Sequence, residues 1–158
     1  MSHIDLDALR EARAKNPGKV AEILAGRKRR ELLRGDDKLF IVAADHPARG
    51  ALGVGKDDMA MADRNVLLER LALALSRPGV DGVLGTPDII EDLALLGLLD
   101  DKIVVGSMNR GGLKGASFEM DDRYTAYDVD GIVESGLDFA KNLVRINLED
   151  AGSVDTLE

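Results

Sequence analysis

The stretch Lys38–Gly55, KLFIVAADHPARGALGVG, decides how this chain folds. Its apolar run, Leu39–Ala44, predicts a short buried β-strand. The run ends abruptly in Asp45 and His46, and Arg49 follows before a glycine-rich turn. In open α/β sheets, ligands bind outside the carboxyl ends of the strands. The stretch therefore predicts a strand that carries a carboxylate, an imidazole and a guanidinium to a ligand-binding edge.

The rest of the chain alternates strand and helix patterns around this strand. Further strands are predicted at 82–85, 103–106 and 143–147, and helices at 5–15, 18–33, 57–76, 86–99 and 129–139. The strands are continuous apolar runs, which is typical of parallel sheets with both faces buried. Two α/β arrangements fit this pattern: the N-terminal half of a (β/α)8 TIM barrel, or a small open doubly wound sheet. We expect an N-terminal helical extension over residues 1–35 and a (β/α)4 partial barrel over 36–158.

Composition excludes several classes of protein. The chain has 158 residues, no cysteine, only 3% aromatic residues and a net charge of −8, which disfavours disulfides, thiolate metal sites and nucleic-acid binding. No apolar run approaches the roughly 20 residues of a membrane span, and no secretory signal opens the chain, so we expect a cytoplasmic protein. The basic run Arg27–Arg30 fits an anion anchor or, as we favour, a solvated helix end.

The residues after the first strand are the first candidates for chemistry. Asp45 and His46 are predicted to be catalytic, with Asp45 moving protons or binding a substrate hydroxyl, and Arg49 is predicted to bind an anionic group. The structural alternative is that Asp45 caps backbone amides while His46 packs under the loop. With only two histidines and no cysteine, we expect no metal and no other cofactor.

Further substrate contacts are predicted from the segments after the third strand. Asn109 and Arg110 begin a loop longer than the usual 2–6 residues, roughly, of such connections, and Arg145 lies on the predicted fourth strand. The alternative for the loop is a surface excursion or a subunit contact. Gly50–Lys56 matches a phosphate-binding loop in part, but Asp57 stands where that motif needs Ser or Thr, so a flexible turn is favoured.

The lysines do not suggest an imine-forming residue. Lys38, Lys102 and Lys141 precede predicted strands, which places them at the edge opposite the candidate site. Lys56 and Lys114 lie in glycine-rich segments that would hold an amine loosely. A catalytic lysine needs a desolvated position that lowers its pKa. The sequence therefore predicts no imine-forming lysine in this chain.

Several segments carry a resemblance to a known family, notably DHPARG at 45–50, GSMNRGG at 106–112 and FEMDDRYTAYD at 118–128. They resemble the N-terminal half of an actinobacterial family of deoxyribose-phosphate-aldolase-like proteins linked to carbohydrate and inositol catabolism. The Asp45-His46 pair is also similar to the start of archaeal-type class I fructose-bisphosphate aldolases, although Pro47 replaces the glycine of that motif. The resemblance implies a TIM barrel and Schiff-base cleavage or formation of a carbon–carbon bond in a small phosphorylated sugar.

The same resemblance implies that part of the machinery lies elsewhere. In such aldolases the imine lysine lies on the sixth strand and the phosphate is held by later loops, so only Asp45 carries over. A single helical turn is predicted from Ser153, where the pattern stops. We therefore expect an incomplete lyase, inactive alone, that forms a homo-oligomer through exposed strand edges. The alternative is a non-enzymatic anion-binding or assembly module.

Overall fold

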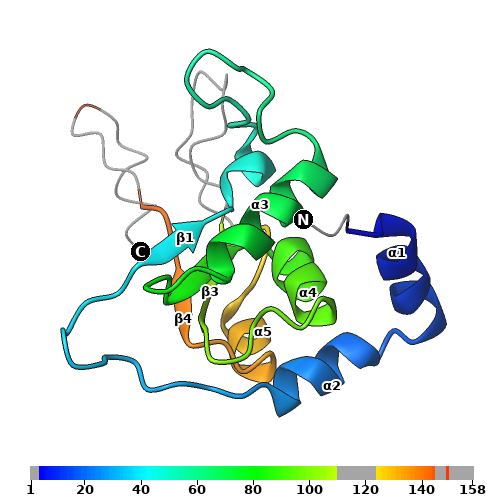
Figure 1. Cartoon of the computed structure of the whole chain (residues 1–158), viewed down its shortest axis with the longest axis vertical. Coiled ribbons are helices and arrows are strands. Elements are labelled where there is room, and N and C mark those ends of the chain that lie inside the picture. Colours follow the sequence, from blue (N-terminus) through cyan, green and yellow to red (C-terminus); the bar gives the residue numbers. More distant parts are fainter. Residues whose placement is uncertain (1–3, 110–123, 145–148, 150–158) are drawn as a thin grey trace.

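A computed structural model describes residues 4–109, 124–144 and 149 (Figure 1). The helices are α1 (Leu6–Lys15), α2 (Lys19–Gly26), the 3-10 helix η1 (His46–Arg49), α3 (Arg64–Leu75), α4 (Pro87–Leu95) and α5 (Val129–Glu134). The strands are β1 (Ile41–Ala43), β2 (Gly82–Gly85), β3 (Ile103–Ser107) and β4 (Phe139–Lys141).

The four strands form one parallel sheet in the order β1-β2-β3-β4. The prediction of an α/β protein with a parallel sheet and alternating helices is confirmed. β2 has its predicted bounds, because Gly82 and Gly85 enclose two aliphatic residues and Thr86-Pro87 starts the next helix. The finer prediction, half of an eight-stranded barrel, is not confirmed by these four strands.

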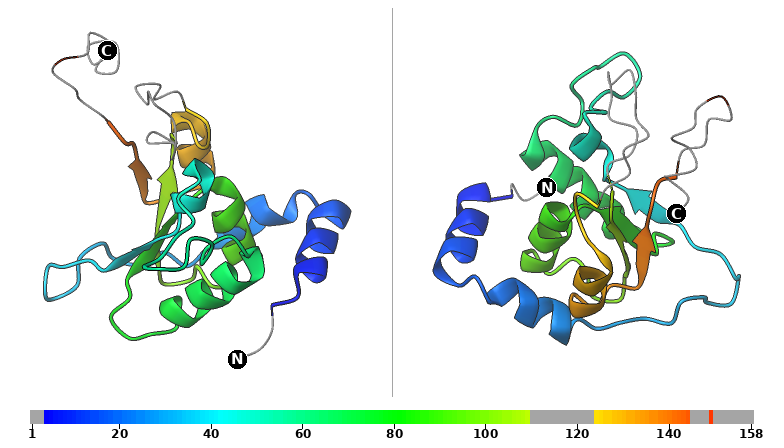
Figure 2. Two further views of the ribbon diagram at one scale, coloured as in Figure 1. Left: turned by 90° about the horizontal axis from the view of Figure 1, so that it is seen from above. Right: turned by 180° about the vertical axis from the view of Figure 1, so that it is seen from behind.

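Alternation along the strands separates the two faces of the sheet. Val83 and Val104, which are neighbours in register, join the hydrophobic core that contains Leu68, Ile90 and Leu93 of α3 and α4. The next residue of β3, Val105, is buried but belongs to the opposite face, outside that core. Figure 2 shows the helices gathered on one side of the strands. We call the side that carries Val105 the open face.

The basic run after α2 differs from both predictions made for it. The predicted helix 18–33 ends at Gly26, and Arg27 takes an extended conformation. The side chains of Arg27 and Arg30 are 2% and 3% exposed and pair with Asp138 and Asp81. The run is therefore neither an anion anchor nor a solvated helix end, but a strap along the amino edge of the sheet.

The fourth strand lies earlier than the predicted 143–147. β4 begins at Phe139, opposite Val105, because the Asp138 carboxylate accepts the Val104 N–H at 2.9 Å and fixes the entry of the strand. The helix before it is also shorter than predicted, since α5 ends at Glu134 and Gly136 turns the chain with φ 59°. Leu143 lies outside β4, and residues 145–147 fall outside the described part of the chain.

The third helix starts later than predicted. The predicted helix 57–76 begins only at Arg64, because the Asp63 side chain caps it by accepting the Val66 N–H at 3.1 Å. Residues 51–63 form turns that lead from η1 to this cap. At the carboxyl end of β1, η1 and these turns therefore take the place of the first half of the predicted helix.

Gly106 is required by close packing between β3 and α5. A Cβ at this position would lie 2.3 Å from Ile132 Cδ1 and 2.7 Å from Leu137 Cδ1. We expect Gly106→Ala to lower the free energy of unfolding by about 1–3 kcal/mol in urea titrations. Gly26→Ala is the matched control, because no atom lies within 4 Å of its Cβ and alanine favours the helix. Equal stability of both variants would contradict this account.

Candidate functional site

Asp45 lies at the carboxyl edge of the sheet, directly after β1, where the sequence predicted it. The residue is 7% exposed. Its Oδ2 atom accepts a hydrogen bond from Lys141 Nζ at 2.7 Å and lies 3.5 Å from Ser107 Oγ. These three residues come from the ends of β1, β3 and β4, and we call them the edge cluster.

The register of the sheet brings the edge cluster together. Ser107 and Lys141 are partners across β3 and β4, so their side chains leave the sheet on the same side. They share that side with Val105 and Phe139, two residues earlier on each strand, which places the cluster at the rim of the open face. The lysine lies at the end of β4, contrary to the prediction that it precedes a strand at the other edge.

The edge cluster contains two opposite charges, the carboxylate of Asp45 and the ammonium group of Lys141, which form an ion pair. Burial would raise the pKa of the Asp45 carboxyl, but the hydrogen bond and the positive charge of Lys141 outweigh burial, so its pKa lies below the ordinary value of 3.8. Asp45 is therefore a carboxylate at neutral pH. A half-buried ammonium beside it has two further N–H donors for other oxygen atoms.

Two other predicted residues follow Asp45 on η1. His46 is 37% exposed at its side chain, and its Nδ1 lies 3.6 Å from Asp45 Oδ1, a charge contact longer than a hydrogen bond. Arg49 Nε is buried and makes no hydrogen bond among the described residues. His46 is thus beside the edge cluster and open to solvent, whereas no observation connects Arg49 to an anion.

The Asn109 side chain links the segments that follow β3 and β4. The residue is 2% exposed, its side-chain amide donates to the Leu143 carbonyl and its side-chain oxygen accepts the Leu143 N–H, both at 2.9 Å. This pair fastens the segment after β3 to the segment after β4, and so keeps Ser107 beside Lys141. The other two predicted substrate contacts, Arg110 and Arg145, lie outside the described residues.

Two cavities lie next to the edge cluster, over the amino end of α4. One of about 330 Å³ is lined by Ala48, Thr86, Pro87, Asp88, Asn109, Thr125 and Ala126. A second of about 240 Å³ also includes Ala48, Thr86 and Asp88 and extends to α3. Neither is lined by Asp45 or Lys141, so the cavities flank the charged pair and do not contain it.

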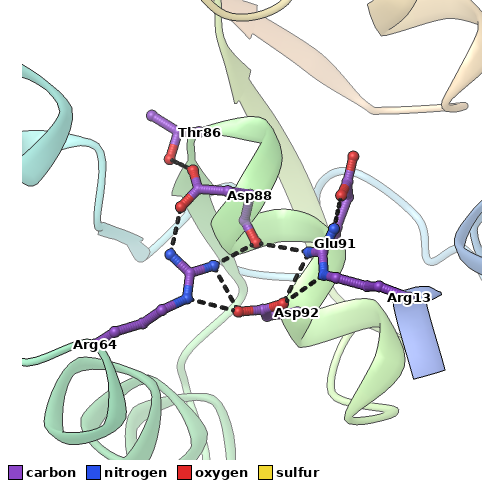
Figure 3. Close-up of polar contacts among 6 residues, drawn as sticks. All are labelled: Arg13, Arg64, Thr86, Asp88, Glu91 and Asp92. Atoms are coloured by element: carbon purple, nitrogen blue, oxygen red, sulfur yellow. Dashed lines mark hydrogen bonds and ion pairs between the residues drawn. The ribbon is translucent and has the colours of Figure 1, made fainter. Parts of the chain in front are cut away.

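The charged residues beside these cavities fix the helices in place (Figure 3). Arg64 of α3 and Arg13 of α1 both bind the Asp92 carboxylate, at 2.5 Å and 2.8 Å, and Arg13 also pairs with Glu91. Asp88 accepts from Thr86 Oγ1 at 2.5 Å. Burial would raise the pKa of Asp88, but the bonds from Thr86 and Arg64 lower it. Asp88, Glu91 and Asp92 thus serve as ion-pair partners of the two arginines.

No group of three or more His, Cys, Asp or Glu side chains within the described residues is placed to hold a metal ion. Among the helices of this part of the chain, none combines the length and apolar character that crossing a membrane requires.

The sequence missed two of the three members of the edge cluster. Ser107 is the last residue of β3, one position beyond the predicted end of that strand. Lys141 was misplaced because the predicted strand covers the apolar run LVRIN at 143–147 and so begins after it. Placing FAK in the strand would have put Lys141 at the carboxyl edge, so the missing signal was the start of β4.

One solved structure is highly similar to this chain. It is the crystal structure of Cgl0159 from Corynebacterium glutamicum (Brevibacterium flavum), with a TM-score of 0.91 and 72% sequence identity over 97% of this chain. The match covers 52% of that protein's chain, so the present chain spans about half its length. No curated protein matches.

The family model that matches residues 37–158 is described as Cgl0159-like. Together with the similar structure, it overturns the predicted membership of a deoxyribose-phosphate-aldolase-like family. The descriptions that depended on that membership, namely lyase, aldolase, TIM barrel and Schiff-base chemistry, are corrected with it, since neither comparison supports them. The chain belongs to the Cgl0159-like family.

Proposed function

We propose that the edge cluster is an enzyme active site that binds a small oxygen-rich metabolite and transfers a proton at it. The observation that carries the proposal is the Lys141–Asp45 ion pair, 2.7 Å long, at the carboxyl edge of a parallel sheet. Ligand sites in such sheets gather at this edge. The lysine stands on the last residue of a strand and its side chain is 23% exposed, so its ammonium group is accessible to a ligand.

The expected chemistry follows from the groups present. Lys141 can donate a hydrogen bond to a substrate carbonyl oxygen and stabilise the negative charge that develops there when a neighbouring C–H bond loses its proton. His46 is the candidate proton acceptor, because imidazole is the side chain that most often serves as a general base. Asp45 orients Lys141 and lies within 3.6 Å of His46.

The substrate class follows from the same donors. An ammonium group, a serine hydroxyl and an imidazole favour hydroxylated carbonyl compounds over apolar ligands. A small phosphorylated sugar and a cytoplasmic location stay predictions within this proposal.

Proton exchange in D2O tests the proposal directly. The chain and the full-length Cgl0159 would each be incubated with small hydroxyketones, hydroxyaldehydes and their phosphate esters, and loss of C–H signals would be followed by proton NMR. We expect exchange beside the carbonyl of at least one compound, reduced about 10²–10⁴-fold by His46→Gln. The non-enzymatic alternative predicts saturable anion binding without exchange. No exchange and no binding in either protein would contradict the proposal.

A further inference from the structure

The two cavities at the carboxyl edge of the sheet lie side by side. They have volumes of about 330 and 240 Å³, and the same three residues, Ala48, Thr86 and Asp88, line both of them. The larger one alone reaches the lower end of the roughly 300–1,000 Å³ that small-molecule sites occupy. Because they share a wall, we treat the two cavities as one site and call it the α4 pocket.

The α4 pocket adjoins the edge cluster on two sides. Ala44 lines the smaller cavity and directly precedes Asp45. Asn109 lines the larger cavity, and its backbone carbonyl accepts a hydrogen bond from Ser107 Oγ at 3.4 Å. A substrate held at the edge cluster can therefore extend into the α4 pocket, and the chemistry of the pocket then selects the far end of that substrate.

Asp88 is the acidic residue that lines both parts of the pocket (Figure 3). Thr86 Oγ1 donates to one of its carboxylate oxygens at 2.5 Å, and Arg64 donates to the other. A carboxylate oxygen can accept two hydrogen bonds, and the Asp88 side chain is 56% exposed. The carboxylate therefore keeps acceptor capacity for a hydroxyl group of a ligand.

The same residue makes the pocket unsuitable for an anion. The amino end of a helix attracts negative charge, but Asp88 in the first turn of α4 already supplies that charge. Burial would raise the pKa of Asp88, but the bonds from Thr86 and Arg64 lower it, so the residue is ionised at neutral pH. Arg64, the cation that lines the smaller cavity, is itself paired with Asp88 and Asp92. A phosphate or carboxylate group in the pocket would therefore meet a like charge.

We propose that the α4 pocket binds the uncharged, hydroxylated end of the substrate and that Asp88 determines this specificity. The assignment rests on the proposed function, because that function places the reacting carbonyl group at the edge cluster. Asp88 accepts hydrogen bonds from the hydroxyl groups, while Ala48 and Pro87 provide apolar surface for the carbon atoms between them. Any phosphate group of the substrate then lies outside the α4 pocket.

Binding of two matched four-carbon compounds tests this assignment without requiring catalysis. Erythritol is uncharged, whereas erythronate has the same hydroxylated chain ending in a carboxylate. Alanine and threonine methyl groups labelled with 13C report binding by NMR, because Ala48 and Thr86 line the pocket and Ala21 on α2 does not. We expect erythritol to shift the signals of Ala48 and Thr86 but not that of Ala21, and to bind about tenfold or more tightly than erythronate.

Asp88→Asn removes the charge of the side chain and keeps its shape. We expect it to weaken erythritol binding about fivefold to tenfold, and to bring the affinities for the two compounds within about twofold of each other. Arg64 keeps its pair with Asp92 in this variant. Asp130→Asn is the matched control, because it makes the same change in the first turn of α5 and lines neither cavity. It should leave both affinities unchanged.

The comparison of the two compounds in the native chain needs no variant and decides the proposal. Tighter binding of erythronate, or no shift at Ala48 and Thr86 with erythritol, would overturn it. Its failure is distinguishable from failure of the proposed function. Binding of erythritol in the pocket without proton exchange in D2O would refute only the proton transfer. Proton exchange without shifts at Ala48 and Thr86 would refute only the assignment of the α4 pocket.

Discussion

Lys141→Met is expected to raise the pKa of the Asp45 carboxyl above its ordinary value and to reduce proton exchange by about 10²–10³-fold. In the native protein the pKa of Asp45 is lowered although burial would raise it, because the hydrogen bond and charge of Lys141 dominate. Methionine keeps the length of the side chain and removes both effects. The carboxyl carbon shift of Asp45, followed by NMR as a function of pH, measures the change without any substrate.

The same substitution reverses the pH dependence that Asp45 gives to stability. In the native protein its folded pKa lies below the unfolded value, so its contribution is present above about pH 4 and is lost as pH falls through the folded pKa. In Lys141→Met the folded pKa lies above the unfolded value. The buried carboxylate then destabilises the variant at neutral pH, and this penalty disappears as acid protonates Asp45. Urea unfolding at several pH values distinguishes the two slopes.

Lys102→Met is the matched control for this experiment. Lys102 also has a hydrogen-bonded ammonium, but its Nζ donates to the Val80 carbonyl at the opposite edge of the sheet. The control should leave the titration of Asp45 unchanged. If Lys141→Met also leaves that titration unchanged, the ion pair does not exist in solution and the proposed active site loses its support.

Local patterns were sufficient to predict most of the sheet. The apolar runs at β1, β2 and β3 are bounded by glycine, proline or acidic residues within a few positions, so each strand could be located from its own neighbourhood. Asp45 was located for the same reason, since it directly follows such a run. Predictions of this kind depend on residues close together in the chain.

Distant partners explain the predictions that were wrong. β4 starts at Phe139 because the Asp138 carboxylate accepts the N–H of Val104, 34 residues earlier. The later run LVRIN is more apolar, so the local pattern predicts the strand there. The strap from Arg27 to Arg30 was read as part of a helix because its carboxylate partners lie 111 and 51 residues away. No pattern in the neighbouring sequence indicates that an arginine side chain will be buried beside a distant carboxylate.

Asp92 shows how strongly such long-range pairs hold this fold together. The residue is 3% exposed on α4, and its two carboxylate oxygens bind different arginines. Arg13 donates to Oδ1 from α1, and Arg64 donates to Oδ2 from α3 (Figure 3). One carboxylate therefore joins three helices. If the Asp92 carboxylate is removed, Arg13 and Arg64 each lose one charged partner.

Asp92→Asn is expected to lower the free energy of unfolding by about 2–3 kcal/mol in urea titrations at neutral pH. Breaking a fully buried pair costs roughly 3–5 kcal/mol, and the partial exposure of both arginines reduces that figure. Asp7→Asn makes the same chemical change in an exposed pair with Arg10 on α1, and should leave stability unchanged within error. If both variants lose the same free energy of unfolding, the effect comes from the change in net charge and not from the buried position of Asp92. A loss confined to Asp92→Asn, with faster amide exchange in α1, would show that this carboxylate holds α1 against the sheet-covering helices.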